Sequence, residues 1–280
     1  MAANTFAMES MTLLAASAVD RDKHADVRLE AAMCKMWGSE QSWEIANDAV
    51  QIRGGRGYET AASLKARGEE PVPLERFLRD CRINTIFEGS SEIMRLFIAR
   101  EALDPHLKVS GAALNSKLPL PQRLRAALKA ALFYAKWYPK QWLPRERFTF
   151  HDSRFTAQLR YVARTSRKLA RALFHAMVRN GPKLEREQLL LGRFVEIGTE
   201  LFAITAACLR AEQLLRSNAA GANPAELIQL VDYFCRASRL RIAEKFRGVR
   251  RNADRAGYRL AQQVLKGDRP DTRNGDSSHA

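Results

Sequence analysis

One glutamate, Glu88, stands at a predicted helix-to-helix junction, where its carboxylate could act as a base. Residues 79–87 carry basic and apolar side chains at helical spacing, and a second apolar run begins just after Ser90 and Ser91. Gly89 permits a turn that other residues resist, and either serine can cap the following helix. Because an Ile-Phe pair directly precedes Glu88, its carboxylate is expected to be poorly solvated and therefore a better base.

A structural role is the alternative for Glu88. Glutamates are common in loops that connect helices, and on these residues alone the structural role is favoured over catalysis. The choice therefore depends on the other patterns in the chain.

A second stretch with chemical potential is the glycine-rich segment at residues 51–58, Gln-Ile-Arg-Gly-Gly-Arg-Gly-Tyr. Repeated glycine cannot sustain a helix, so this segment is expected to end the helix before it. Glycine amides can also approach a phosphate closely, since no side chain intervenes. By itself the segment indicates only a loop.

Three segments in order resemble the acyl-CoA dehydrogenase family. Residues 87–93 (Phe-Glu-Gly-Ser-Ser-Glu-Ile) are similar to that family's catalytic glutamate segment, residues 51–58 to its flavin-contacting turn, and residues 74–80 to the segment between them. The resemblance covers about residues 1–107 and is closest to the long-chain and very-long-chain branch, which carries an extra C-terminal helical domain.

The resemblance implies FAD-dependent oxidation of a fatty acyl-CoA to the trans-2-enoyl-CoA, a step of fatty acid β-oxidation. Glu88 would be the catalytic base, and Gly89 would let the substrate approach. The implied cofactor contacts are Gln51, Ile52, Arg53, Gly54 and Gly55, which reach the flavin of a neighbouring subunit, together with Ser90, Ser91 and Glu92. The implied partners are an electron-transferring flavoprotein and further copies of the chain, in a homodimer or higher oligomer.

The net charge changes sharply along the chain. Residues 1–110 contain 14 Lys and Arg against 17 Asp and Glu, whereas residues 111–280 contain 32 against 14. This step predicts a domain boundary. We expect a partial acyl-CoA dehydrogenase helical domain at 1–107, a linker with an amphipathic segment at 108–152, a helical bundle at 153–266 and a disordered tail at 267–280.

Apolar periodicity and breakers predict an all-α fold, since alternation typical of strands is missing. A surface loop is expected at 59–73, and Pro105 is expected to end a helix. The expected helices cover residues 5–19, 27–50, 73–86, 91–103, 121–142, 153–180, 184–217 and 224–264.

The four cysteines are widely spaced and form no Cys-x-x-Cys pair, so no metal site is predicted and free thiols in a reducing cytoplasm are expected. No signal-peptide pattern and no apolar run as long as a membrane span occur. The predicted location is therefore cytoplasmic, with peripheral contact at the inner face of the membrane if residues 121–142 provide it.

Residues 121–142 combine apolar, basic and aromatic side chains at helical spacing. Such a helix could lie on an anionic membrane, with its cations at the headgroups and its rings at the boundary. The alternative, which is slightly favoured, is that its apolar side packs against the bundle. That apolar side consists of Leu124, Leu128, Ala131, Leu132 and Ala135.

The chain is also expected to be a fragment of the full enzyme, because the family builds its site from two further domains. Alone, it is expected to bind FAD weakly or not at all. The competing function is a non-enzymatic basic helical module that binds a protein or nucleic acid, motivated by the basic second half. Signatures of nucleic-acid-binding folds are missing from the sequence, so no nucleic-acid partner is expected.

Overall fold

The computed structural model describes residues 1–115, 117–143, 147–150, 152–217 and 223–267. Within these ranges every regular element is a helix, which confirms the all-α prediction. The elements are α1 Ala2–Arg21, α2 Arg28–Arg53, α3 Gly55–Tyr58, α4 Ala61–Ala66, α5 Leu74–Ile83, α6 Ser91–Leu114, α7 Leu120–Lys140, α8 Ser153–Asn180, η1 Gly181–Arg186, α9 Gln188–Arg216, α10 Pro224–Arg250 and α11 Asp254–Leu265.

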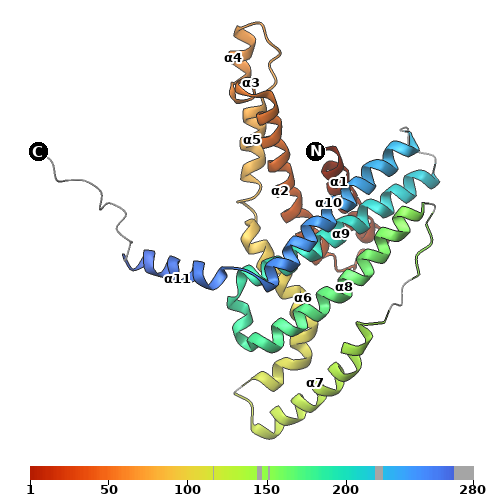
Figure 1. Ribbon diagram of the computed structural model, residues 1–280, viewed down its shortest axis with the longest axis vertical. Helices are drawn as coiled ribbons and strands as arrows, with labels where there is room; N and C mark the ends of the chain where they lie inside the picture. Colours follow the sequence, from red (N-terminus) through yellow and green to blue (C-terminus); the bar gives the residue numbers. More distant parts are fainter. Residues whose placement is uncertain (116, 144–146, 151, 218–222, 268–280) are drawn as a thin grey trace, which may run out of the picture.

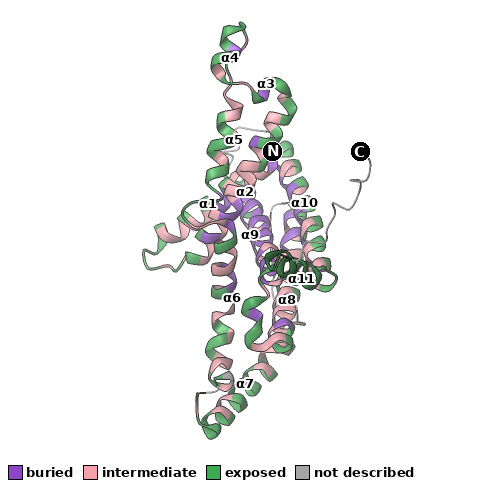
Figure 2. Cartoon of the chain, turned by 90° about the vertical axis from the view of Figure 1, so that its left-hand side faces the viewer, coloured by how far each residue is buried: buried purple, intermediate pink, exposed green. Residues whose placement is uncertain are grey.

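Helix α9 is the centre of the molecule, because it packs against α1, α6, α8 and α10 (Figure 1). Its buried residues lie on all sides of the helix, as expected for a helix without a solvent face. Many of them are small, which allows neighbouring backbones to approach closely. Figure 2 shows this buried centre, with exposed residues concentrated on α11 and toward the two ends of the molecule. The fully buried small residues of α9 are Ala203, Ala207, Cys208 and Ala211.

The first part of the chain shares its hydrophobic core with the C-terminal helices. Ala7 and Met11 of α1 belong to the same cluster as Phe155 of α8 and Phe234 of α10. The domain boundary predicted after residue 107 falls inside α6, which continues to Leu114. The charge step therefore does not mark a break between helices.

Two other helix boundaries differ from the prediction. Pro105 lies inside α6 and does not end it, because α7 packs along α6 and supports the helix beyond the proline. The helix expected at 224–264 is interrupted after Arg250. There Arg251 is extended and the Asn252 side chain accepts a hydrogen bond from the Asp254 amide at 3.2 Å, so a new helix begins.

The segment expected to be a surface loop at 59–73 contains a short helix, α4. The Thr60 hydroxyl accepts a hydrogen bond from the Ser63 amide at 3.2 Å, and Leu64 is fully buried. A cap and one buried apolar side chain are enough to order a single turn in this position. The expected turn at 218–221 and, apart from residue 267, the expected disordered tail lie outside the described residues.

Ionic groups that are buried or partly buried connect the helices. The Glu200 carboxylate of α9 accepts two hydrogen bonds from the Arg241 guanidinium of α10, at 2.6 and 2.8 Å, and one from the Trp37 indole of α2 at 3.4 Å. Arg95 of α6 pairs with Glu40 at 2.8 Å and with a carboxylate of α9 at 3.1 Å. Since a buried charge without its partner is costly, these pairs fix the relative positions of the helices.

All four cysteines are free thiols. Two of them are in contact despite their wide spacing in the sequence. The Cys208 and Cys235 sulfurs lie 3.7 Å apart in the core between α9 and α10. Hydrogen bonding to Cys208 and burial raise the pKa of the Cys235 thiol, and burial raises that of Cys34 to about 11. These thiols are therefore protonated near neutral pH.

Helices α2 and α5 form an arm that leads away from this core. They run side by side, and α3 and α4 lie at the tip of the arm (Figure 1). The arm carries the glycine-rich turn at its tip and the Glu88 turn at the opposite end of α5. It is the element that positions both candidate segments.

Candidate active site

The turn between α5 and α6 holds Glu88 in a left-handed backbone conformation. Glu88 has φ 51° and Gly89 has φ 93°, so two successive residues reverse the chain before α6 begins. A Cβ added to Gly89 would lie 2.7 Å from the Met94 sulfur. The Ser90 hydroxyl accepts a hydrogen bond from the Ile93 amide at 3.4 Å and caps α6. The capping prediction for Ser90 is therefore confirmed, and Glu88 adopts a conformation that non-glycine residues enter at a cost.

Lys35 of α2 anchors this turn. Its ammonium donates hydrogen bonds to the carbonyls of Asn84 at 3.0 Å, of Phe87 at 3.2 Å and of Gly89. These carbonyls follow the end of α5, where backbone acceptors lack helical partners and attract a cation. Sequence reasoning missed Lys35, because a lysine in the middle of a charged helix looks like a solvated residue.

A second set of hydrogen bonds closes the turn from inside. The Ser91 amide donates to the Thr85 carbonyl at 3.1 Å, and the Thr85 hydroxyl donates to the Arg82 carbonyl at 2.9 Å. The Arg82 guanidinium donates to the Thr85 hydroxyl and lies 5.3 Å from the centre of the Trp43 ring. Ser91 is buried, and its hydroxyl has no hydrogen-bond partner within the described residues. The turn is thus fixed on both sides.

The Glu88 side chain itself is exposed. Apolar side chains lie near Glu88, but they are themselves open to solvent and do not enclose its carboxylate. The expectation of a poorly solvated carboxylate is therefore wrong for this chain. The physical reason is that no other part of the described chain packs over this side of the turn. The uncovered apolar side chains near Glu88 are Ile83 (48% exposed), Ile86 (53%), Phe87 (46%) and Ile93 (58%).

The other carboxylate of the segment, Glu92, is held in its charged form. A hydrogen bond from its own backbone amide lowers its pKa, and the Ser90 hydroxyl and two nearby arginines act in the same direction. A carboxylate stabilised in this way is a weaker base. This environment argues against Glu92 as the base.

The glycine-rich turn lies at the tip of the arm and is open to solvent. Gln51 and Ile52 are exposed, Gly54 has φ 62°, and nothing lies within 4 Å of a Cβ added to Gly54 or Gly55. Gly57 is different, because an added Cβ would lie 2.6 Å from the carbonyl oxygen of residue 50. The turn is tighter than a simple loop, since α3 begins directly after Gly54.

The arginines of this turn are engaged with the segment that follows. Arg53 donates to the Glu70 carbonyl at 3.3 Å, and Arg56 pairs with Glu69 at 2.5 Å. The Gly54 amide donates to the Gln51 carbonyl at 3.1 Å, and the Gly54 carbonyl accepts from the Gly57 amide at 2.9 Å. The open backbone at Gly55 is therefore the part of the turn that a phosphate could approach.

The structure does not bring the two candidate segments together. Lys35, beside the Glu88 turn, and Gln51 are separated by most of the uninterrupted helix α2. At 1.5 Å per residue this corresponds to about 24 Å. One copy of the chain thus presents the two segments at opposite ends of its arm. Close together at the Glu88 turn are Gly89, Ser90, Ser91 and Glu92, whereas Gln51, Ile52, Arg53, Gly54 and Gly55 gather at the tip.

Helix α7 turns its leucines to solvent. The slightly favoured prediction, that its apolar side packs against the bundle, is therefore wrong. Instead Tyr134 and Trp137 pack on His106 of α6 and Phe174 of α8, with ring centres 4.9–6.0 Å apart, and hold the opposite side of α7. The exposed residues of the apolar row are Leu120 (64%), Leu124 (61%), Leu128 (64%) and Leu132 (58%), and Ala131 and Ala135 are also exposed.

Two general features complete the description. Among the residues that the structure describes, no group of three or more His, Cys, Asp or Glu side chains could hold a metal ion. In the same part of the chain no helix is long and apolar enough to cross a membrane.

Comparison with known proteins identifies the relatives of this chain. Residues 1–103 match the family described as "Acyl-CoA dehydrogenase, C-terminal domain". The chain is 46% identical over 270 residues to a probable acyl-CoA dehydrogenase, FadE10, of Mycobacterium tuberculosis, which covers 95% of this chain and 41% of that protein. It is 36% identical over 115 residues to the human very long-chain specific acyl-CoA dehydrogenase, covering 41% of this chain and 16% of that protein.

A solved structure shares the fold. The acyl-CoA dehydrogenase of Bacillus anthracis, crystallised in complex with FAD, superposes with a TM-score of 0.61 and 23% sequence identity over 98% of this chain and 44% of that protein. The chain therefore spans less than half the length of the relatives that match nearly all of it.

Proposed function

Because residues 1–103 match the C-terminal domain of the acyl-CoA dehydrogenase family, we propose that this chain takes part in the FAD-dependent α,β-dehydrogenation of fatty acyl-CoA to trans-2-enoyl-CoA. The observation that carries the proposal is the Glu88 turn. This turn has an exposed carboxylate and a left-handed backbone, and the Lys35 ammonium fixes it. Solvent-exposed apolar side chains lie beside it and leave a surface that substrate or further protein could cover.

In this reaction Glu88 accepts the proton from the α-carbon of the thioester. Apolar cover from the substrate and the remaining protein would desolvate its carboxylate and strengthen it as a base. Gly89 has no side chain that could obstruct the acyl group, and Lys35 keeps the turn from moving when the proton is transferred.

FAD fits the residues that are present, since the open backbone at Gly55 suits a phosphate and the α6 N-terminus favours negative charge. When bound, FAD would take up the hydride that leaves the β-carbon. Residues 51–55 would hold one part of the cofactor, and Ser90, Ser91 and Glu92 would lie beside another.

We propose that a second copy of the chain is needed, in a homodimer or higher oligomer. The separation of about 24 Å within one chain supports this, because the tip of one arm can then serve the site of another copy. Uncovered apolar residues on the arm support an interface there. These uncovered apolar residues include Ile52 (79% exposed), Tyr58 (80%) and Phe77 (49%). Electrons would pass to an electron-transferring flavoprotein.

The test uses this chain co-expressed with the segments of the Mycobacterium tuberculosis relative that it does not span. With palmitoyl-CoA and a dye acceptor, Glu88→Gln is expected to keep bound flavin and to lose turnover by a factor of about 10² or more. Glu244→Gln, at an exposed glutamate of α10 outside both candidate segments, is the matched control and should retain most of the turnover. Turnover near wild type in flavin-loaded Glu88→Gln would remove Glu88 from the role of base.

The isolated 280-residue chain is expected to bind FAD weakly or not at all, because it offers only open edges of a cofactor site. An absorption spectrum of the purified chain with added FAD measures this directly. Stoichiometric flavin that survives gel filtration would show that the chain alone completes the site.

We further propose that α7 makes peripheral contact with the cytoplasmic face of an anionic membrane. The exposed leucine row lies beside exposed Lys129, Lys136 and Lys140, which is the pattern of an interfacial helix. Flotation with anionic and neutral vesicles should show binding to the anionic ones only, and loss of binding in Lys129→Glu/Lys136→Glu. If the wild-type chain does not float with anionic vesicles at low salt, membrane contact is refuted.

A further inference from the structure

A cavity of about 910 Å³ lies between α6, α7, α8 and the start of α9. We propose that it binds the long acyl chain of an anionic lipid, such as a fatty acid. This inference does not rest on dehydrogenation, because the cavity is formed by helices beyond the Glu88 turn and involves no flavin contact.

The walls of the cavity are mainly apolar. Well-packed protein interiors rarely leave voids larger than a water molecule, and this volume falls within the range of small-molecule sites. Water needs two to four polar partners to occupy such a space stably, and the walls provide few. An apolar ligand is therefore the better occupant. The main apolar lining residues are Leu103, Leu107, Ala130, Phe174, Met177 and Leu184.

The cavity is not filled by α7, because the residues that α7 contributes to its wall are mainly small. Ala127 and Ala130 line the cavity, while the leucines of the same helix face solvent. An amphipathic helix that served only to pack would turn its larger apolar residues toward the protein. The contact of Tyr134 with Phe174, whose ring centres lie 4.9 Å apart, keeps α7 in place without filling the cavity.

One guanidinium group, that of Arg100, gives the site its preference for an anion. Arg100 lines the cavity and is exposed, and its side chain makes no ion pair or hydrogen bond with the described residues. Arg123, near the start of α7, has a buried Nε without a hydrogen-bond acceptor within the described chain, but it does not line the cavity. Glu185 also lines the cavity and is exposed, so a carboxylate or phosphate is expected on the arginine side.

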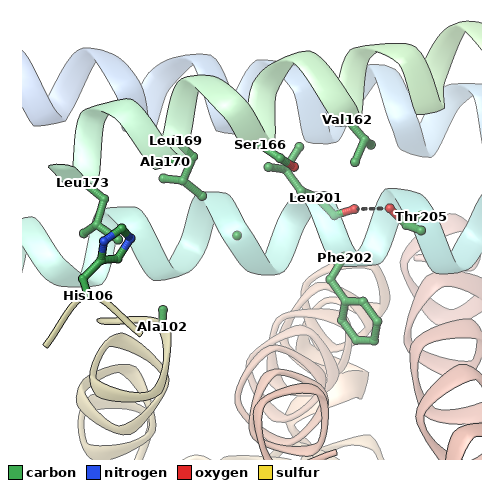
Figure 3. A pocket seen from close by; sticks show the side chains of 11 residues that line it. Ala102, His106, Val162, Ser166, Leu169, Ala170, Leu173, Leu201, Phe202 and Thr205 are labelled. Atoms are coloured by element: carbon green, nitrogen blue, oxygen red, sulfur yellow. Dashed lines mark hydrogen bonds between the residues drawn. The ribbon is translucent and has the colours of Figure 1, made fainter. Parts of the chain in front are cut away.

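A neighbouring groove does not meet these conditions. It has a volume of about 400 Å³, lies between α6, α8 and α9, and is lined by His106, Leu173 and Phe202 among others (Figure 3). Burial lowers the pKa of His106, so the imidazole is neutral near pH 7. Neither lysine nor arginine lines this groove, and it offers no partner for an anionic head group.

The test is direct binding to the complete 280-residue chain, measured by calorimetry with palmitate, palmitoyl-CoA and lysophosphatidylglycerol below their micellar concentrations. These three ligands share the acyl chain and an anionic head, and their relative affinities distinguish a free acid, a thioester and a membrane lipid as the source. Ala130→Trp fills the cavity and is expected to weaken binding by about tenfold or more.

Ala131→Trp is the matched control, because residue 131 is exposed on α7 next to the buried Ala130, and this variant should bind as wild type does. Circular dichroism establishes that both variants fold. Binding of none of the three ligands to the wild-type chain, or equal loss in the two tryptophan variants, would overturn the proposal.

Arg100→Gln tests the head group without altering the cavity walls. It should weaken palmitate binding by roughly fivefold to tenfold and leave hexadecanol, which has no charge, unaffected. An equal effect on both ligands would contradict the anion assignment. Glu88→Gln should bind palmitate as wild type does, so a failure of the dehydrogenase proposal and a failure of this one give different results.

Discussion

Replacing Lys35 by methionine tests how the Glu88 turn is held. The ammonium of Lys35 donates three hydrogen bonds to backbone carbonyls of the turn. Hydrogen bonds to charged groups contribute about 1.5–3 kcal/mol each when buried, but two of these are exposed to solvent and are worth much less. Methionine preserves most of the side-chain volume, so the loss reflects the anchor.

We therefore expect Lys35→Met to lower the free energy of unfolding by about 2 kcal/mol, which corresponds to roughly 4–6 °C in Tm for a chain of this size. Local opening should increase as well. The Ser91 amide, which donates to the Thr85 carbonyl across the turn, should exchange its hydrogen faster by about tenfold or more.

The assay combines urea unfolding followed by circular dichroism with hydrogen exchange of residues 84–94. Lys65→Met is the matched control, because Lys65 is exposed and its side chain has no hydrogen bond or ion pair with the described residues. If Lys35→Met unfolds and exchanges as Lys65→Met does, the three carbonyl contacts do not stabilise the turn and the reasoning is refuted.

Three further predictions concern the frame around the site. Gly57→Ala should lower the free energy of unfolding by about 1–3 kcal/mol because its Cβ would meet backbone, whereas Gly55→Ala, which points into open space, should be tolerated; thermal melts compare the two. Arg241→Met leaves the buried Glu200 carboxylate without its ion pair and should lower the free energy of unfolding by about 3–5 kcal/mol. The control Arg236→Met removes an exposed arginine and should cost less than about 1 kcal/mol. Equal losses in urea titrations would argue against a stabilising role of the Arg241–Glu200 pair. Burial lowers the pKa of His106 below its unfolded value of 6.5, so the folded state favours the neutral imidazole. The free energy of unfolding should therefore be highest above pH 6.5 and should fall as the pH drops below that value. In His106→Asn this fall should be smaller, as measured by tryptophan-monitored melts between about pH 7.5 and 5.

Local signals in the sequence determined most of the helices and the identity of the candidate segments. The starts of α8 at Ser153 and of α10 at Pro224 agree with the prediction, because Asp152 and Asn223 cap these helices through contacts two residues away. The left-handed turn around Gly89 follows likewise from its own residue types. Such features need no information about distant parts of the chain.

Tertiary structure decided what surrounds those segments. Periodicity shows that α7 has an apolar side but not which side the bundle covers. Only packing turned its leucines outward and placed Ala127 and Ala130 in the wall of a cavity. The anchor of the Glu88 turn comes from Lys35, 49 residues or more before the carbonyls it binds. Helix α6 passes through Pro105 because α7 supports it, and Cys208 meets Cys235 across two helices. Each of these features depends on contacts between residues far apart in sequence, whose energies no local pattern contains.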